Sequence, residues 1–338
     1  MPMVTKELLA KLKNTSILSD EENTLGYVST GCFALNHVIA GRYDGGIPIG
    51  GITQIRGDAS TGKTLFITSI LSQAQKKGYY CKLLDAENAF NKEFAKKVGI
   101  DPENLLYSTP DCLETAFLDA EETIKAIRES DKDTPIVIAI DSLAVLPSKK
   151  ELDAETYEKS PIDGAQRAIV IGGCLRKINT LLRKHKVALI VINQIRQKVG
   201  VMYGNPETNA AGGRSLEYYL HVDLKTTRKE KLMDGDKPLG IRGEIDCKKN
   251  KCSIPYRSCE FELLFDQGLN AYYGLVDMLA ADKVITKSPN GRCQIGETKF
   301  TKSEFMNLLY DVSNKDFETI RKLFGMELNN DKQLRHTT

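Results

Sequence analysis

The sequence predicts an α/β protein in which helices cover a largely parallel, partly mixed sheet. Two near-continuous apolar runs, Pro135–Asp141 and Val187–Asn193, are typical of parallel strands buried on both faces. A long helical pattern, Gly164–Lys186, lies between them. This strand–helix–strand order favours parallel pairing with right-handed crossovers, and it places the centre of the fold in the middle of the chain.

The alternation of strands and helices begins earlier in the chain, and strands without intervening helices follow it later. Strand and helix patterns follow one another through Gly51–Arg56, Lys63–Lys77, Tyr79–Asp85 and Lys92–Val98. The first of these helices has its inward residues at helical spacing: Leu65, Phe66, Ile70, Leu71 and Ala74. Three later runs alternate more strongly and are expected to extend the sheet with antiparallel strands: Leu216–Leu224, Ile241–Cys247 and Cys259–Phe265.

A length of 338 residues allows about two folding units. We divide the chain into residues 1–28, a short docking helix (Lys6–Lys13) and linker; residues 29–267, the main core; and residues 268–338, a small α+β domain. A hairpin near Pro289–Gly291 and a polar, loose tail from Asn329 are expected in the last part. The helices expected there are Gly274–Ala281, Lys302–Asp311 and Lys315–Phe324.

The composition excludes several classes of protein. With 47 Lys and Arg against 45 Asp and Glu, the net charge of +2 excludes a strongly basic nucleic-acid coat protein but permits a local basic surface. No apolar run is long enough for a transmembrane helix, and the first residues lack the apolar segment of a signal peptide. The eight cysteines form no Cys-x-x-Cys pair. We therefore expect a cytoplasmic protein with reduced thiols and no membrane partner.

One segment matches the pattern G-x-x-x-x-G-K-[ST] in full, between a predicted strand and a predicted helix. Glycines let successive backbone N–H groups turn toward one anion, and the helix N-terminus adds positive potential. Lys63 is expected to reach the β- and γ-phosphates of ATP, and the Thr64 hydroxyl to bind Mg²⁺. The segment predicts a nucleoside triphosphate site made of Gly57, Asp58, Ala59, Ser60, Thr61, Gly62, Lys63 and Thr64.

Polar side chains also stand at the ends of other predicted strands. Asp141 ends an apolar strand, where a carboxylate can hold Mg²⁺ through water. Glu87 and Asp85 are both candidates for the carboxylate that orients the attacking water, and Glu87 is favoured. Gln194 follows a further strand. Because the carboxyl ends of parallel strands meet at one edge of a sheet, we expect these residues to lie near Lys63.

The stretch from Ile195 to Leu216 has the composition of a functional loop. It contains four glycines and three basic residues against the single acid Glu207. Loops of this length inside compact domains are usually functional or unordered. Cations interleaved with apolar residues suit single-stranded DNA, because cations hold phosphates while apolar side chains contact bases. From the residues alone, a flexible surface loop is the open alternative.

Several segments together resemble the RecA family of bacterial strand-exchange recombinases. NQIRQKVGVMYGNPET (Asn193–Thr208) is similar to the family's second DNA-binding loop almost residue for residue. The resemblance covers about residues 28–290 in register, and the departures from it favour a bacteriophage origin. Besides the phosphate-binding segment it includes VSTGCFALNHVIAG (Val28–Gly41), LLDAENAF (Leu83–Phe90), IAIDSLAVL (Ile138–Leu146), KKNK (Lys248–Lys251) and GLNAYYGLVDMLAADKVI (Gly268–Ile285).

The resemblance implies roles for single residues. Glu87 matches the family's catalytic glutamate, and Gln194 the γ-phosphate sensor that couples nucleotide state to the DNA loop. Lys249 and Lys251 match a pair that reaches the neighbouring subunit's triphosphate. Phe94 stands where the family stacks an aromatic ring on adenine. The positions that match DNA contacts are Arg176, Arg196, Lys198, Val199, Gly200, Gly212 and Gly213.

The sequence also departs from the family pattern. Ala59 replaces an acid that is usual in the phosphate-binding loop, and Asn91 replaces an Asp that reads adenine. The first DNA loop, about Ala154–Asp163, has its own sequence, and the acidic C-terminal tail is missing. Because an acidic tail competes with DNA for basic surface, we expect DNA binding that is less self-inhibited and depends less on Mg²⁺.

The resulting hypothesis is a DNA-dependent ATPase that uses ATP and Mg²⁺. It forms head-to-tail helical filaments on single-stranded DNA and pairs that strand with homologous duplex DNA for strand exchange. Lys6–Lys13 or a segment near Tyr218 would dock neighbouring subunits. Single-strand-binding and loader proteins are further expected partners. The alternatives are a ring-forming motor (a helicase or translocase) with the same core, and a DNA-binding protein without turnover.

Overall fold

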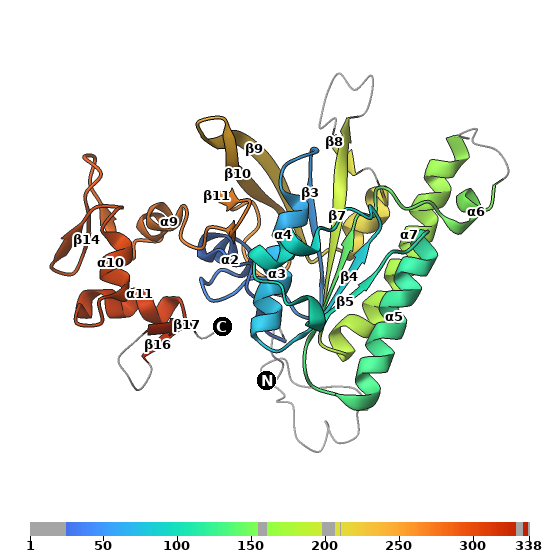
Figure 1. Cartoon of the computed structure of the whole chain (residues 1–338), viewed down its shortest axis with the longest axis horizontal. Coiled ribbons are helices and arrows are strands. Elements are labelled where there is room, and N and C mark those ends of the chain that lie inside the picture. The colour runs from blue at the N-terminus through green and yellow to red at the C-terminus, as the bar shows by residue number, and fades with distance from the viewer. Residues whose placement is uncertain (1–24, 155–160, 198–206, 210, 329–333, 337–338) are drawn as a thin grey trace, which may run out of the picture.

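The computed structural model describes residues 25–154, 161–197, 207–209, 211–328 and 334–336, and within them a ten-stranded mixed sheet forms the centre (Figure 1). Its parallel part runs, in spatial order, through β9 (Val222–Asp234), β3 (Ile52–Gly57), β7 (Val187–Gln197), β6 (Ile136–Asp141), β4 (Tyr80–Asp85) and β5 (Leu105–Ser108). Beyond β9 the sheet continues antiparallel through β10 (Lys237–Asn250), β11 (Ser258–Leu264) and β12 (Gly268–Leu269). The predicted fold class, α/β with a largely parallel and partly mixed sheet, is confirmed.

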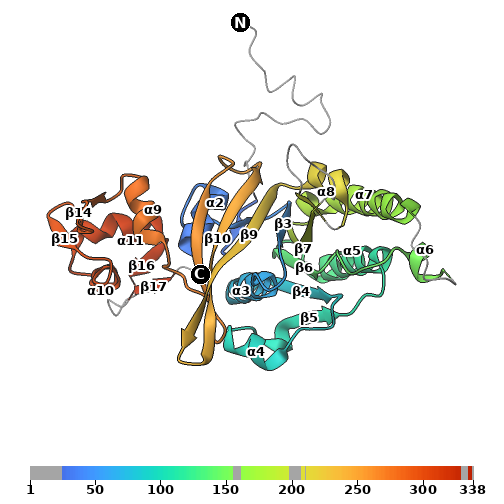
Figure 2. The same cartoon turned by 90° about the horizontal axis from the view of Figure 1, so that it is seen from above.

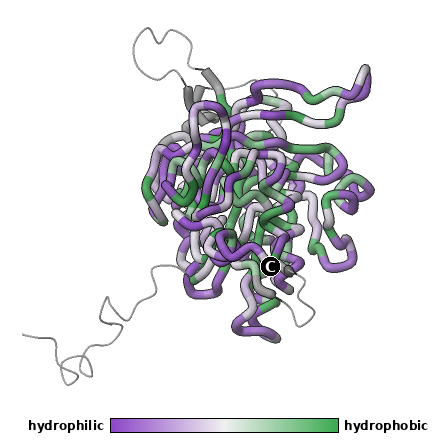
Figure 3. Tube along the Cα trace, turned by 90° about the vertical axis from the view of Figure 1, so that its left-hand side faces the viewer, coloured by the Kyte–Doolittle hydropathy of each residue, from purple (hydrophilic) through white to green (hydrophobic). Residues whose placement is uncertain are grey.

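Helices cover both faces of the sheet (Figure 2). A strand between two helical layers has no solvent-facing side, so every residue of β6 is buried and the apolar segments gather inside the molecule (Figure 3). One face packs against α2 (Phe33–Ala40) and α3 (Lys63–Lys76). The other packs against α5 (Leu113–Ser130), α7 (Pro161–Lys184) and α8 (Gly213–Tyr219).

The expectation of a strand over Leu216–Leu224 is wrong in its first half. Residues up to Tyr219 belong to α8, and strand β9 starts only at Val222. Leu216 and Leu220 are both fully buried and lie four residues apart, one turn of a helix, so the same apolar spacing satisfies a short helix packed on α7. Gly212 begins this helix with a φ of 79°, a conformation that favours glycine.

The expected loop after Ile195 is also shorter than predicted. Strand β7 continues to Gln197 and pairs antiparallel with β8 (Glu207–Asn209). Ile195 lies opposite Asn209 and Arg196 opposite Thr208. The backbone hydrogen bonds of this two-stranded extension therefore continue past the sheet before the chain enters the predicted DNA loop. Residues 198–206 lie outside the described part of the chain, as does the expected helix at residues 6–13.

The C-terminal part packs around its own apolar cluster beside the sheet (Figure 1). A hairpin turns at Pro289–Gly291, as predicted, between β13 (Thr286–Lys287) and β14 (Cys293–Ile295). The tail was expected to be loose, but Leu334–His336 form β17, paired with β16 (Met326–Leu328). Main-chain pairing of this kind needs no apolar side chain, so polar composition does not exclude it. The remaining elements are α9 (Leu275–Ala281), β15 (Thr298–Phe300), α10 (Phe305–Tyr310), a 3₁₀ turn (Lys315–Phe317) and α11 (Glu318–Leu323).

Two elements of the core, β5 and α5, were not anticipated from the sequence. Helix α5 buries its apolar stripe against the sheet at helical spacing, through Leu113, Ala116, Phe117, Ala120, Ile124 and Ile127. The smaller elements are β1 (Tyr27–Val28), β2 (Ile47–Pro48), α4 (Lys92–Lys97), a 3₁₀ turn (Pro102–Asn104) and α6 (Lys149–Leu152). Among the described helices, none combines the length and the hydropathy that crossing a membrane requires.

Replacing Phe261 by alanine tests the core between the antiparallel strands and α3. Its fully buried ring meets that of Phe66 edge to face, with centroids 4.8 Å apart. We expect Phe261→Ala to lower the free energy of unfolding by about 3–5 kcal/mol, because the truncation leaves a cavity. Equilibrium unfolding in guanidinium chloride measures the change. Ile169→Ala, at a side chain that is 72% exposed, is the control, and equal effects in both variants would contradict this packing.

Candidate functional site

The phosphate-binding segment joins the end of β3 to the start of α3, as the sequence predicted. Gly62 precedes the helix with a φ of 86°, and a Cβ atom on Gly57 would lie 2.3 Å from the Thr226 hydroxyl. Both positions therefore require glycine. The Lys63 ammonium curls over the loop and donates to the carbonyls of Gly57 (3.1 Å) and Asp58 (2.5 Å). These two acceptors show that the ammonium lies where it can reach an anion held by the loop.

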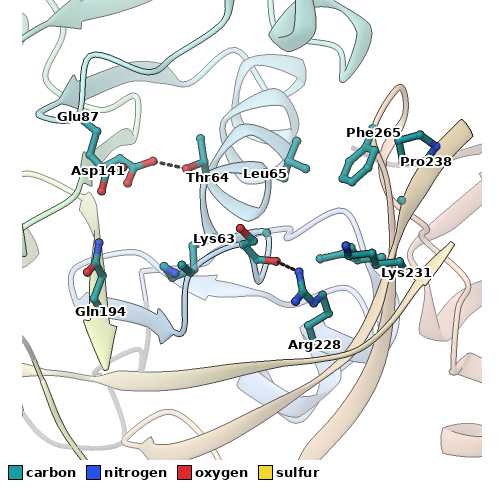
Figure 4. Close-up of a pocket in the computed structure, with 15 residues that line it drawn as sticks. Lys63, Thr64, Leu65, Glu87, Asp141, Gln194, Arg228, Lys231, Pro238 and Phe265 are labelled. Carbon is teal, nitrogen blue, oxygen red and sulfur yellow. Dashed lines mark hydrogen bonds between the residues drawn. The ribbon is translucent and has the colours of Figure 1, made fainter. Parts of the chain in front are cut away.

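A cavity of about 610 Å³ opens beside this loop (Figure 4). Its walls come from the carboxyl ends of the parallel strands on one side and from β9, β10 and the residue after β11 on the other. The structure thus brings together four predicted residues from different parts of the chain: Lys63, Glu87, Asp141 and Gln194. Burial lowers the pKa of the Lys63 ammonium, and the nearby carboxylates of Asp141 and Glu87 act in the opposite direction.

Thr64 and Asp141 form an oxygen pair at the floor of the cavity. The Thr64 hydroxyl donates to Asp141 Oδ2 at 2.6 Å. Burial raises the pKa of Asp141 to about 6, with a further contribution from the Glu87 and Asp85 charges, while the Thr64 hydrogen bond opposes the shift. A hydroxyl and a carboxylate oxygen this close fit Mg²⁺, which usually binds through one or two protein oxygens, phosphate oxygens and water. Within the described residues no cluster of three or more metal-ligating side chains offers another site.

The structure separates the two candidate carboxylates after β4. Glu87 is exposed, lines the cavity and accepts a hydrogen bond from the Ser142 hydroxyl at 2.8 Å. Asp85 is buried, and its Oδ2 accepts from the Phe90 N–H (2.9 Å) and the Tyr107 hydroxyl (3.0 Å). Asp85 therefore holds the following loop in place. Glu87 has the access to the cavity that a water-orienting group needs.

Gln194 lies beside a buried amide clamp that the sequence did not indicate. The Asn193 side chain donates to the Ala211 carbonyl (2.9 Å) and accepts from the Ala211 N–H (3.2 Å). The same side chain accepts from the Gln194 N–H and donates to Gln54 in the neighbouring strand β3. The fully buried Asn193 side chain therefore holds two backbone positions. One is Gln194, which lines the cavity, and the other is Ala211, at the far end of the predicted DNA loop.

Outside the phosphate-binding segment, three predicted nucleotide residues do not line the cavity. Phe94, on α4, packs against the main apolar cluster and is not among the lining residues. Lys249 lies at the far end of β10 and Lys251 directly after it, near the amino end of β3, whereas the phosphate-binding loop follows the carboxyl end of β3. Their ammonium groups donate to the carbonyls of Glu217 and Tyr218. Within one chain these lysines therefore have no contact with the nucleotide site.

The predicted DNA-binding residues are partly described. Arg176 projects from α7 at the surface, with its Nε 3.5 Å from the Tyr219 hydroxyl. A Cβ on Gly212 would lie 2.8 Å from the Cβ of Leu216, so this glycine is required by the packing of α8. Gly213 has open space around it. Arg196 belongs to β7, and Lys198, Val199 and Gly200 lie outside the described residues.

Sequence reasoning missed the wall of the cavity opposite the carboxylates. Six residues form it: Arg228, Lys231, Pro238, Gly240, Ile241 and Phe265; Figure 4 labels four of them, Arg228, Lys231, Pro238 and Phe265. The sequence analysis expected no strand over residues 225–240, and alternation of charged and apolar residues does not show which strand faces a cavity. The signal that could have indicated the irregularity was Gly243. A Cβ atom added there would lie 2.3 Å from the Thr227 carbonyl oxygen, where the pairing of β9 with β10 is irregular.

A strand, a glycine-rich loop, a helix and a carboxylate ending the neighbouring strand together define a P-loop nucleotide-binding protein. A family model, the RecA N-terminal domain, matches residues 6–270. Protein RecA of Clostridium acetobutylicum is 31% identical over 327 residues, which are 96% of this chain and 88% of that protein. The chain belongs to the RecA family and is a protein of DNA recombination and repair with ATP and DNA as ligands.

Removing the amide clamp is expected to loosen the base of the predicted DNA loop. Asn193→Ala leaves the buried N–H and carbonyl of Ala211 without their partner, so we expect a loss of roughly 2–4 kcal/mol in stability. Hydrogen exchange at the Ala211 amide should become faster, and mass spectrometry measures it. Asn104→Ala, at an exposed asparagine bonded to Asp101, is the control. Unchanged exchange at Ala211 would contradict the clamp.

Proposed function

We propose that the protein is a DNA-dependent ATPase that assembles head to tail on single-stranded DNA and exchanges strands with homologous duplex DNA. One observation carries the proposal: Lys63, Glu87, Asp141 and Gln194, from four parts of the chain, line one cavity at the edge of the parallel sheet. Membership of the RecA family supports the recombinase over a ring-forming motor. We place this activity in the cytoplasm, with single-strand-binding and loader proteins as further partners.

The cavity suits ATP in one orientation. The triphosphate would lie over the N-terminus of α3, where backbone N–H groups and the Lys63 ammonium attract its charge. The base would lie at the other end, against the apolar surface of Ile241, Pro238 and Phe265. Phe265 is therefore a second candidate for packing on the base, beside Phe94, for which the resemblance implies that role. Magnesium, held by Thr64 and Asp141, would neutralise charge that develops on the phosphates.

Glu87 is proposed to orient and deprotonate the water that attacks the γ-phosphate. Its carboxylate reaches the cavity, and the hydrogen bond from Ser142 holds one of its oxygens. The Ser142 hydroxyl follows Asp141 directly, so the base and the magnesium ligand are positioned by the same strand end. This arrangement keeps the second Glu87 oxygen available for water.

Gln194 is proposed to report the nucleotide state to DNA. Its side chain lines the cavity, and its backbone N–H is bonded to Asn193, which also holds Ala211. A shift of Gln194 toward a γ-phosphate would therefore move the strand that leads into the predicted DNA loop and, through Asn193, Ala211 on its far side. Two states of this strand extension would give tight and weak DNA binding.

Changing Glu87 should separate binding from hydrolysis. We expect Glu87→Gln to lower the DNA-stimulated rate of phosphate release by roughly 10²–10⁴, the usual contribution of a general base, with ATP binding retained. Asp85→Asn should reduce the rate far less, because Asp85 contacts Phe90 and Tyr107 and does not line the cavity. A colorimetric phosphate assay measures both variants. Equal losses in the two variants would contradict the role of Glu87.

Mixing two inactive variants tests whether Lys249 acts on a neighbouring subunit. Lys63→Ala removes a chain's own nucleotide contact, and Lys249→Ala removes the contribution to its neighbour. Each alone should lack DNA-stimulated turnover, and the mixture should recover a measurable part, because some interfaces then carry both lysines. Light scattering should show masses that grow with protein concentration, as for an open polymer. A mixture as inactive as its components would contradict action in trans, and a discrete hexamer would favour the ring motor.

A further inference from the structure

A β-bulge in β9 turns two cations toward the nucleotide cavity. Glu230 pairs with Arg242 of β10, but Arg228 pairs with the next residue, Gly243, so Lys229 is an extra residue in β9. In a regular strand, residues three apart point to opposite faces. Here Arg228 and Lys231 both line the cavity. Bulges of this kind redirect side chains beside functional sites.

The neighbouring charges lie on the opposite face and are neutralised there. Lys229 pairs with Glu244 (3.1 Å) and Glu260 (2.9 Å). In the adjacent row, Arg242 pairs with Glu230 (2.9 Å) and Glu262 (2.7 Å). The bulge therefore separates the charged residues of this hairpin onto two faces. The residues that form ion pairs lie on the outer face, and Arg228 and Lys231 lie on the face that lines the cavity.

Within the described part of the chain, neither Arg228 nor Lys231 forms an ion pair with a carboxylate. Arg228 donates only to a backbone oxygen, the Ser60 carbonyl at 3.4 Å, and so rests against the phosphate-binding loop itself. Both side chains are exposed to the solvent of the cavity. An arginine and a lysine without counter-charge beside a phosphate-binding loop form a surface that attracts an anion.

Their place along the cavity indicates which part of the nucleotide they meet. Figure 4 shows Glu87, Asp141 and Gln194 at one end and Phe265 and Pro238 at the other, with Arg228 and Lys231 on the stretch between Lys63 and the apolar end. The first end is the one proposed above for the γ-phosphate, and the second is the one proposed for the base. The section between them corresponds to the α- and β-phosphates.

We propose that Arg228 and Lys231 are nucleotide-binding residues of the same chain that hold the α- and β-phosphates. This inference rests on the proposed ATPase function and adds two contacts to it. Because these phosphates are present in both ATP and ADP, the two cations contribute equally to binding of substrate and product. They therefore set affinity and leave the chemical step to Lys63, Glu87 and the residues supplied by the neighbouring subunit.

Nucleotide titration by calorimetry, with Mg²⁺ and without DNA, tests the proposal. We expect the double variant Arg228→Ala/Lys231→Ala to bind ATP and ADP roughly tenfold more weakly, with the same factor for both, because it loses charge-assisted contacts to phosphates common to both. In DNA-stimulated turnover, KM should rise while kcat changes little. Lys229→Ala, which removes the same charge from the opposite face, should bind as the wild type does.

The outcomes distinguish this inference from the function on which it rests. Unchanged affinity in the double variant, or a loss confined to ATP, would overturn the assignment to the α- and β-phosphates. A loss matched by Lys229→Ala would show that the hairpin's charge acts only at long range and would also overturn it. If the double variant melts well below the wild type, Lys231→Ala alone replaces it and must weaken both nucleotides. Wild-type protein that binds no ATP, or Lys63→Ala protein that binds it normally, would overturn the proposed ATPase as well.

Discussion

The nucleotide site depends on a buried row of polar side chains that crosses three strands of the sheet. Asn193 of β7 donates to Gln54 of β3, and Gln54 donates to Asp223 of β9 at 2.8 Å. Asp223 also accepts from Arg56 at 3.0 Å. Such groups are costly to bury unless each has its partner, so the row is satisfied only when the three strands keep one register. A slip of one residue would turn every member of the row to the wrong face.

That register is what brings the site residues together. It sets Gly57, at the carboxyl end of β3, beside Gln194 of β7, so the phosphate-binding loop and Gln194 face the same cavity. It also holds Ala211 through Asn193, which fixes where the chain returns from the predicted DNA loop. The structural support of the nucleotide site and that of the predicted DNA loop therefore share Asn193, and we expect a change in one to affect the other.

The turn from parallel to antiparallel pairing explains why Lys249 lies far from the nucleotide cavity of its own chain. Strand β10 runs back along β9 and carries Lys249 toward the amino end of β3, away from the loop that follows the carboxyl end. No rotamer of a lysine reaches across the sheet from there. Two copies stacked with the amino edge of one sheet above the carboxyl edge of the next would bring these lysines to a nucleotide, and such a head-to-tail contact forms an open polymer when its rotation does not close.

The sequence predicted the positions of site residues that stand at strand ends. It did not predict the positions of residues that depend on a local irregularity such as a bulge. The phosphate-binding segment, Asp141 and Gln194 stand at the ends of apolar runs in the sequence, so topology alone predicts that they meet, although β7 continues past Gln194 to Gln197. Glu87 and Asp85 are two residues apart, and the structure distinguishes them by access to the cavity for Glu87 and by burial and the hydrogen bonds to Phe90 and Tyr107 for Asp85. Leu216 and Leu220 fit a strand run and a helix turn alike, which is why α8 was read as a strand. Arg228 and Lys231 were missed because a single extra residue in β9 decides which way they point.

The two walls of the cavity come from strands that pair differently, and each wall contributes a different kind of side chain. The parallel strands supply carboxylates and an amide, whose positions follow from the fold, and the antiparallel hairpin supplies the two cations, whose positions follow from a bulge. Ala59 fits this division. It precedes Ser60, whose carbonyl Arg228 contacts, and the acid usual at this position in related sequences would attract the same guanidinium. With alanine there, Arg228 has one carboxylate fewer competing with the nucleotide. Ala59 and the two cations on β9 therefore both favour binding of the nucleotide phosphates.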